Sequence, residues 1–180
     1  MSKIVILKAS PRKNGNSNTL AAAFAEEAQR AGAFITEYDV TNMEIAGCRS
    51  CYGCMTKGAC VFHDDFEKIA KALCDADSIV IASPVYWYTF PAQIKAVIDR
   101  WFSLYVAGKD FSGKKVALLS CCEEENEETF AGIHFSFERT MALMKAEIVG
   151  EVLIPKVYDV GEIKNTNGEE QARELARKFF

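Results

Sequence analysis

Four cysteines lie close together between Cys48 and Cys60, and their spacing is the strongest chemical signal in this chain of 180 residues. Two residues separate Cys48 from Cys51 and Cys51 from Cys54, and five more precede Cys60. Two-residue gaps let neighbouring thiolates converge on one metal centre, and the longer gap lets the fourth thiolate come round to it. The pattern therefore indicates soft-metal or redox chemistry.

Three interpretations of this cysteine loop stay open on the residues alone. All four thiolates could ligate a 4Fe-4S cluster, the loop could carry only free thiols, or it could bind zinc, although zinc sites more often use two separated cysteine pairs. The chain has seven cysteines, an odd number, which favours a reduced compartment over a disulfide scaffold. We expect Cys74 to pack on an apolar helical stripe, and adjacent Cys121 and Cys122 to pack or to form a redox pair.

The polar segment 9–19 is a second candidate, because it lies between an aliphatic run and a helical pattern. It is rich in Ser, Asn and Gly and carries Arg12 and Lys13. Such a strand-to-helix loop offers backbone N–H groups and short hydroxyl donors at the positive end of a helix, which is how proteins hold a phosphate. The alternative is an ordinary hydrophilic turn with a helix cap. No G-x-G-x-x-G or Walker sequence is present, so neither a dinucleotide fingerprint nor a P-loop is predicted.

The segment 83–91 is a third candidate, because it places four aromatic residues between two prolines. These residues are Pro84, Tyr86, Trp87, Tyr88, Phe90 and Pro91. Proline restricts the backbone, the intervening amides can meet the polar edge of a planar ligand, and aromatic side chains can cover its faces. An aromatic cluster that only packs the loop or an oligomer interface is the alternative.

Aliphatic runs at 3–8, 78–82 and 116–119 predict strands buried on both faces, and helical periodicities lie between them. With further strands expected at 34–40 and 148–154, the sequence predicts an α/β fold: a doubly wound, five-stranded parallel sheet with helices on both faces. Ligands bind such sheets at the carboxyl ends of the strands, which would bring the polar and aromatic segments into one site.

The starts of three helices can also be predicted from local signals. We expect Asn16 or Ser17 to cap the first helix and Asp64 with Glu67 to form a capping-box-like pair. Pro91 suits the first turn of a later helix.

Composition restricts the class of protein. We expect residues 1–180 to form one domain, with the cysteine loop at 48–60, since no linker or repeat interrupts the chain. A net charge of −4 and a pI near 5.3 argue against nucleic acid as a partner. No apolar run has the length of a membrane span or a signal-peptide core, so we expect a cytoplasmic protein with no membrane partner.

The two loops together resemble the NADPH-dependent FMN reductases and iron-sulfur flavoproteins of flavodoxin-like fold. The resemblance rests on Ser10-Pro11-Arg12 with Asn16–Thr19, and on Ser83–Tyr88 with Pro91–Lys95 and Asp99-Arg100. It implies that the first loop holds the FMN phosphate through Ser10, Arg12, Asn16, Ser17, Asn18 and Thr19. It also implies that the flavin ring lies against the backbone of Pro84, Val85, Tyr86 and Trp87, and near Ser120 in a third loop. The chain departs from the family pattern at Ala9, where a glycine is usual, and at Ser120-Cys121-Cys122-Glu123.

The resemblance implies an FMN-dependent oxidoreductase that takes electrons from NAD(P)H and passes them to a quinone, flavin or similar small-molecule acceptor. No catalytic side chain is predicted, because the flavin performs the chemistry. The alternative is an iron-sulfur flavoprotein that transfers electrons between a ferredoxin-like partner and FMN, with Cys48, Cys51, Cys54 and Cys60 as cluster ligands. A third is a ligand-binding sensor without turnover. The aromatic loop Tyr86–Phe90 and the expected helix with Trp101, Phe102 and Tyr105 carry more large apolar side chains than one small domain usually exposes, which predicts a homodimer or homotetramer.

Overall fold

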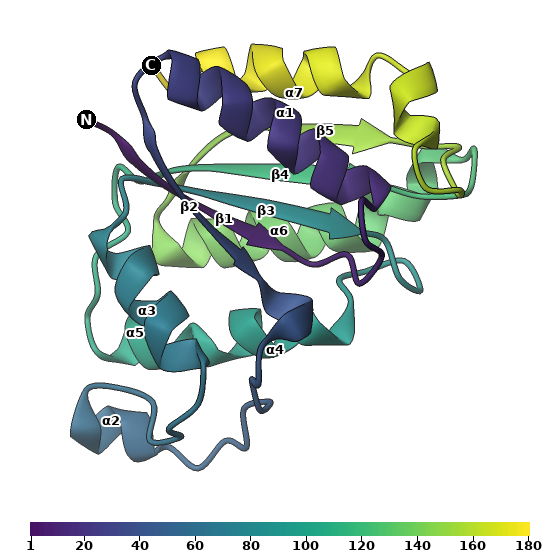
Figure 1. The fold of residues 1–180 in the computed structure, drawn as a ribbon. Helices are drawn as coiled ribbons and strands as arrows, with labels where there is room; N and C mark the ends of the chain where they lie inside the picture. Colours follow the sequence, from purple (N-terminus) through teal and green to yellow (C-terminus); the bar gives the residue numbers. More distant parts are fainter.

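A five-stranded, all-parallel sheet forms the centre of the computed structural model, which describes residues 1–180 (Figure 1). The strand order is β2-β1-β3-β4-β5, so the predicted flavodoxin-like fold is confirmed. The strands are β1 (Lys3–Lys8), β2 (Phe34–Asp39), β3 (Ser78–Pro84), β4 (Lys115–Cys121) and β5 (Glu147–Ile154). The second strand is one residue shorter than predicted, and the fifth one residue longer.

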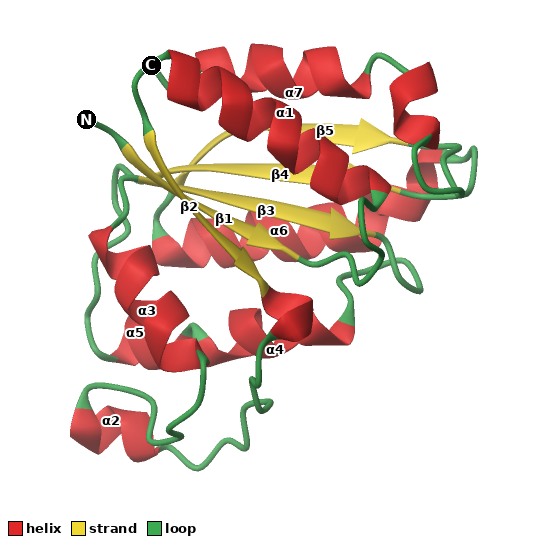
Figure 2. Cartoon of the chain, in the orientation of Figure 1, coloured by secondary structure: helices red, strands yellow, loops and turns green.

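Helices cover both faces of the sheet (Figure 2). On one face lie α1 (Asn16–Arg30) and α7 (Gly168–Arg177). On the other lie α3 (Phe66–Asp75), α4 (Ala92–Arg100), α5 (Phe102–Val106) and α6 (Ala131–Met144). The short helix α2 (Gly53–Lys57) lies within the cysteine loop and away from the sheet. Three 3-10 turns complete the chain: η1 (Val40–Asn42), η2 (Glu127–Phe130) and η3 (Glu162–Asn165).

The alternation of side chains along the strands divides the interior into two cores. In β1, Ile4 and Ile6 pack with the α1 and α7 side, whereas Val5 and Leu7 pack with the α3, α4 and α6 side. Both sets are buried, because successive side chains of a strand point to opposite faces and each face is covered by helices. No helix combines the length and the hydrophobicity that crossing a membrane requires.

The predicted cap of the first helix is wrong. Helix α1 begins at Asn16 with Gly15 as its N-cap, and neither Asn16 nor Ser17 caps it through a side chain. The Asn16 amide is engaged elsewhere, in a contact described below. Pro91 is the N-cap of α4, so it marks the helix start as expected but lies one residue before the first turn in which we placed it.

The predicted capping box at the start of α3 is also wrong. The N-cap is Asp65, whereas the Asp64 carboxylate accepts a hydrogen bond from the Phe66 N–H at 3.0 Å. Glu67 does not return to the helix start, because its carboxylate lies 2.5 Å from Nδ1 of His63. Asp64 thus satisfies an N–H of the first turn without a reciprocal partner.

Candidate functional site

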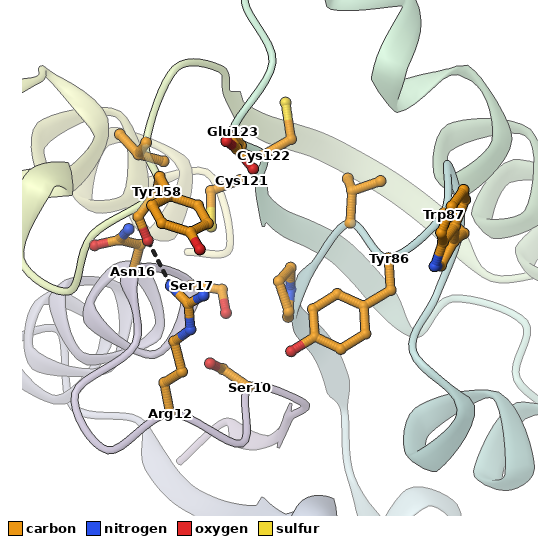
Figure 3. Close-up of a pocket in the computed structure, with 13 residues that line it drawn as sticks. Ser10, Arg12, Asn16, Ser17, Tyr86, Trp87, Cys121, Cys122, Glu123 and Tyr158 are labelled. Carbon is orange, nitrogen blue, oxygen red and sulfur yellow. Dashed lines mark hydrogen bonds between the residues drawn. The ribbon is translucent and has the colours of Figure 1, made fainter.

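A cavity of about 290 Å³ lies where the loops after β1, β3 and β4 meet (Figure 3). Strands β1 and β3 are neighbours, and the chain proceeds outward from them in opposite directions. This is the switch point at which open α/β sheets bind ligands. The residues that line the cavity are Ser10, Arg12, Asn16, Ser17, Pro84, Val85, Tyr86, Trp87, Cys121, Cys122, Glu123, Val157 and Tyr158.

The loop after β1 forms the polar wall of the cavity. The loop is tightly closed: a Cβ atom on Gly15 would lie only 2.2 Å from Oγ of Ser10, so a larger residue would not fit there. The hydroxyl of Ser17, in the first turn of α1, is buried and has no hydrogen-bond partner. Buried hydroxyl groups are almost always paired, so this orphaned group beside a cavity indicates a polar ligand. The adjacent N–H groups of the first helical turn favour an anionic one.

The loop after β3 forms the aromatic wall. Tyr86 and Thr89 exchange two backbone hydrogen bonds, of 2.9 and 3.1 Å, which close a two-residue turn. The residues in the turn, Trp87 and Tyr88, have φ values of 46° and 65°, in the left-handed region that favours glycine. Strained conformations of this kind concentrate at functional sites. The turn projects the Trp87 side chain outward, where it is 92% exposed.

Two contacts hold this turn in place. The hydroxyl of Tyr88 donates to Oε1 of Glu124 at 3.2 Å, and the carboxylate of Glu124 also accepts from the Thr129 hydroxyl at 2.6 Å. The negative charge of Glu124 and this hydrogen bond raise the pKa of Tyr88 above its ordinary value. Helix α6 approaches the turn so closely that a Cβ atom on Gly132 would lie 2.1 Å from the Tyr88 carbonyl oxygen.

Tyr158 supplies a third wall that we did not predict from the sequence. Its ring borders the cavity opposite Tyr86 (Figure 3). Arg12 Nη1 donates to the Tyr158 carbonyl oxygen at 2.5 Å, and the guanidinium carbon lies 5.0 Å from the centre of the ring. The sequence offered only a general indication that Tyr158 belongs to the site. Its segment follows the fifth strand and so reaches the carboxyl edge of the sheet, where ligands bind.

Asn16 ties this third wall to the first. Its amide nitrogen donates to the Asp159 carbonyl at 3.0 Å, and its oxygen accepts from the N–H groups of Gly161 and Ile163 at 3.1 and 3.4 Å. The side chain therefore uses both its donor and acceptor ends within the protein. This contact explains why Asn16 does not cap α1.

Two adjacent cysteines close the cavity at the end of β4. Both Cys121 and Cys122 are buried. Burial raises the pKa of the Cys121 thiol to about 12, and it also raises the pKa of Cys122. These thiols therefore stay protonated at neutral pH, and this part of the cavity carries no thiolate charge.

The structure brings most of the predicted cofactor residues together around the cavity. Ser10, Arg12, Asn16, Ser17, Pro84, Val85, Tyr86 and Trp87 all line it. Asn18 and Thr19 instead line a second hollow, of about 1070 Å³, on the outer side of the first loop. Ser120 is fully buried and lines neither, because its hydroxyl donates to the Ser83 carbonyl at 2.8 Å.

The four loop cysteines surround a separate cavity of about 30 Å³ that shares no residue with the first. Cys48 and Cys51 are exposed, Cys54 is buried and Cys60 is half-buried. No group of three or more Cys, His, Asp or Glu side chains in the structure is placed to hold a metal ion. The donor set nevertheless has the soft chemistry that iron-sulfur clusters require, and all four cysteines line one cavity.

Comparisons with known proteins assign the chain to one family. The NADPH-dependent FMN reductase family matches residues 2–134. An iron-sulfur flavoprotein of Methanosarcina thermophila is 35% identical over 137 residues, which are 73% of this chain and 71% of that protein. An azoreductase from Bacillus anthracis has a similar structure, with a TM-score of 0.80 and 22% identity over 99% of this chain and 100% of the other. An NAD(P)H:quinone oxidoreductase from Methanothermobacter marburgensis gives a TM-score of 0.75 and 19% identity, with 99% and 96% covered.

Proposed function

The chain belongs to the NADPH-dependent FMN reductase family, and on this premise we propose that it binds FMN in the 290 Å³ cavity and oxidises NAD(P)H. The observation that carries this proposal is the buried, unpaired hydroxyl of Ser17 beside the cation of Arg12, at one end of a cavity whose other end is aromatic. A phosphate attached to a flat, apolar ring system has the chemistry that matches both ends. Bound FMN would supply the hydride and electron transfer between nicotinamide and acceptor.

The side chains of the first loop would hold the phosphate. The Ser17 hydroxyl gains the partner that it lacks, and the Arg12 guanidinium supplies a charge-assisted hydrogen bond. Ser10 lies against Gly15 at the base of the same loop. FMN fits this cavity better than FAD, because the chain offers a single phosphate loop and no adenine-binding unit.

The backbone of the aromatic turn would meet the polar edge of the flavin ring. Some N–H groups of this segment already donate to other residues of the chain, so only the remaining ones could donate to the flavin. The N–H of Val85 donates to the Cys121 carbonyl at 3.0 Å, and that of Tyr86 donates to Thr89. The N–H of Trp87 has no such partner within the chain. Among the residues predicted to contact the ring, Trp87 is therefore the one with a free backbone donor.

Quinones, free flavins and similar planar oxidants are the acceptors that we propose. Aromatic side chains at the mouth, Tyr86 and Trp87, favour flat apolar molecules through stacking. No other binding domain is needed if the nicotinamide and the acceptor use the same site in turn, as in ping-pong kinetics. Of the two proteins of similar fold, one is named an NAD(P)H:quinone oxidoreductase, and its name states a quinone acceptor.

The test begins with the cofactor and continues with turnover. Heat should release a yellow compound that mass spectrometry identifies as FMN, and the protein should oxidise NADH or NADPH faster when a quinone is added. Release of FAD would contradict the site assignment. If the protein binds FMN but oxidises neither NADH nor NADPH, with or without quinone, the FMN site stands and the reductase activity is refuted.

A second candidate function is electron transfer through a 4Fe-4S cluster held by Cys48, Cys51, Cys54 and Cys60. It is favoured by the single cavity that all four cysteines line and by the iron-sulfur flavoprotein among the relatives. The test is anaerobic reconstitution with ferrous iron and sulfide, followed by reduction with ferredoxin. Wild type should bind near-stoichiometric iron, and Cys51→Ser should lose iron but keep FMN, because the two cavities share no residue. Zinc instead of iron would indicate a structural loop, and no bound metal would leave only the reductase.

A further inference from the structure

Arg100, the last residue of α4, is buried at the base of the cysteine loop. Its side chain is 0% exposed, and Asp64 is its carboxylate partner, with Nη1 2.5 Å from Oδ2. A buried charge is costly unless several hydrogen bonds satisfy it. An apolar side chain would pack at this position without the cost of burying a charge. The hydrogen-bond partners of the guanidinium therefore indicate its role.

The guanidinium joins the two arms of the cysteine loop. Nη1 donates to the Ala46 carbonyl, before the first cysteine, at 3.3 Å. Nη2 donates to the Phe62 carbonyl, after the last cysteine, at 3.2 Å, and to the sulfur of Cys60 at 3.3 Å. One side chain of α4 therefore fixes both ends of a segment that pairs with no strand of the sheet.

Asp64 also holds the two arms of the cysteine loop together. Its carboxylate accepts from the Ala46 N–H and from the Phe66 N–H, each at 3.0 Å, in addition to Arg100. Burial alone would raise the pKa of Asp64, but these hydrogen bonds outweigh it and lower the pKa below its ordinary value. The Phe66 ring lies 4.3 Å from the guanidinium carbon and fixes its plane. The guanidinium is thus held from several sides and presents an N–H to Cys60.

We propose that Arg100 is the positioning residue of the cysteine loop: it orients the Cys60 sulfur and supplies the positive charge next to a thiolate-bound iron centre. This role rests on the second candidate function given above. Hydrogen bonds to ligand sulfurs and nearby charge set the affinity and the reduction potential of such centres. A cation beside Cys60 favours the more negative, reduced form, so its loss should make the potential more negative.

Arg100→Gln tests this role, with Arg49→Gln as the matched control. Arg49 also borders the cysteine cavity and lies 5.2 Å from the Phe62 ring, but it makes no hydrogen bond to a cysteine sulfur. Each variant is reconstituted anaerobically with ferrous iron and sulfide and then titrated with an iron chelator. Arg100→Gln should lose half its iron at a chelator concentration about 10- to 100-fold lower than wild type, the usual effect of removing an outer-shell partner. Arg49→Gln should behave as wild type.

Three further readouts separate positioning from general damage to the fold. Bound FMN and the thermal unfolding midpoint report on the rest of the domain, and the reduction potential of the iron centre reports on the charge. Arg100→Lys keeps the charge but not the planar fork, so it should partly restore the potential and the iron affinity; it carries the test if Arg100→Gln does not fold. Equal iron affinity and reduction potential in wild type, Arg100→Gln and Arg100→Lys would overturn the role of Arg100 but not the metal site. A wild type that binds no iron would overturn the metal site and this role together, while leaving FMN binding intact.

Discussion

Arg12 and Tyr158 join the loops that follow the first and the last strand of the sheet. The Arg12 guanidinium donates to the Tyr158 carbonyl at 2.5 Å and lies 5.0 Å from the centre of its ring. Because both residues line the cavity, the cation is held at the rim before any ligand arrives. Preorganisation of this kind lowers the entropy lost on binding.

Replacing Arg12 by alanine should weaken FMN binding by about 1.5 to 3 kcal/mol, the range for a hydrogen bond to a charged group. Fluorescence titration of cofactor-free protein with FMN measures the change. Lys13→Ala is the matched control, since Lys13 is a neighbouring cation that lines the outer hollow and not the cavity. Equal affinity of Arg12→Ala and wild type would remove Arg12 from the phosphate site.

His134 and Glu151 should make a small, pH-dependent contribution to stability. Nδ1 of His134 lies 3.0 Å from Oε2 of Glu151, and this hydrogen bond raises the pKa of His134 although burial opposes it. A pKa raised in the folded state stabilises the fold below the ordinary value of about 6.5 and loses that effect as the pH rises through the folded pKa. The imidazole is 52% exposed, so the contribution should be below about 1 kcal/mol.

Urea unfolding of wild type and His134→Gln at two pH values measures this contribution. The variant should have the lower free energy of unfolding at pH 5.5, and the difference should vanish at pH 9. A difference of the same size at both pH values would show that the imidazole acts through packing and not through its charge.

The sheet could be predicted from the sequence because each central strand is a continuous aliphatic run, as at Ile79–Ala82, and such runs mean burial on both faces. Helix starts were predicted less well. A polar side chain such as Asn16 fits a cap by type, but its tertiary partners at Asp159 and Gly161 lie more than 140 positions away in the chain. A local sequence pattern cannot show that these distant partners compete with the helix cap for the Asn16 side chain.

The same limit applies to the candidate site. The position of the loop between a strand and a helix predicted a phosphate site, and the resemblance to the reductase family implied Ser10, Arg12 and Ser17 as its residues. Tyr158 was missed, because nothing local distinguishes it from any exposed tyrosine and its role depends on Arg12 reaching it across the sheet edge. Ser120 fits a third loop by position, yet its hydroxyl turns inward to Ser83.

Alkylation should distinguish Cys121 from the cysteines of the loop. Burial raises the pKa of Cys121 to about 12, so very little thiolate forms at pH 8.5, whereas Cys48 and Cys51 are exposed. Iodoacetamide at that pH should modify Cys48 and Cys51 in metal-free protein and leave Cys121 intact, as read by peptide mass spectrometry. Denatured protein is the control, in which all seven should react. Equal labelling of Cys121 in native protein would contradict its burial.

Association into a homodimer or homotetramer is a further prediction. Trp87 is 92% exposed, and Tyr88, Phe102 and Tyr105 are also exposed, which is an unusual amount of aromatic surface for one small domain. Light scattering at micromolar concentration should give a mass of two or four chains. Trp87→Ser should lower the association constant, whereas Phe135→Ser, a change at another exposed aromatic residue, serves for comparison. A monomeric wild type would contradict the prediction.

Gly132→Ala should disturb the aromatic turn through the backbone. The added Cβ would lie 2.1 Å from the Tyr88 carbonyl oxygen, and a backbone atom cannot rotate away as a side-chain end can, so either α6 or the turn must shift. Overpacking of this kind costs about 1 to 3 kcal/mol in the free energy of unfolding, and displacement of Trp87 should weaken FMN binding at the same time. Urea unfolding and FMN titration measure the two effects. Gly47→Ala is the control, because nothing lies within 4 Å of its added Cβ and its φ is not positive. If Gly132→Ala binds FMN and unfolds as wild type does, the contact between α6 and the turn does not position the aromatic wall.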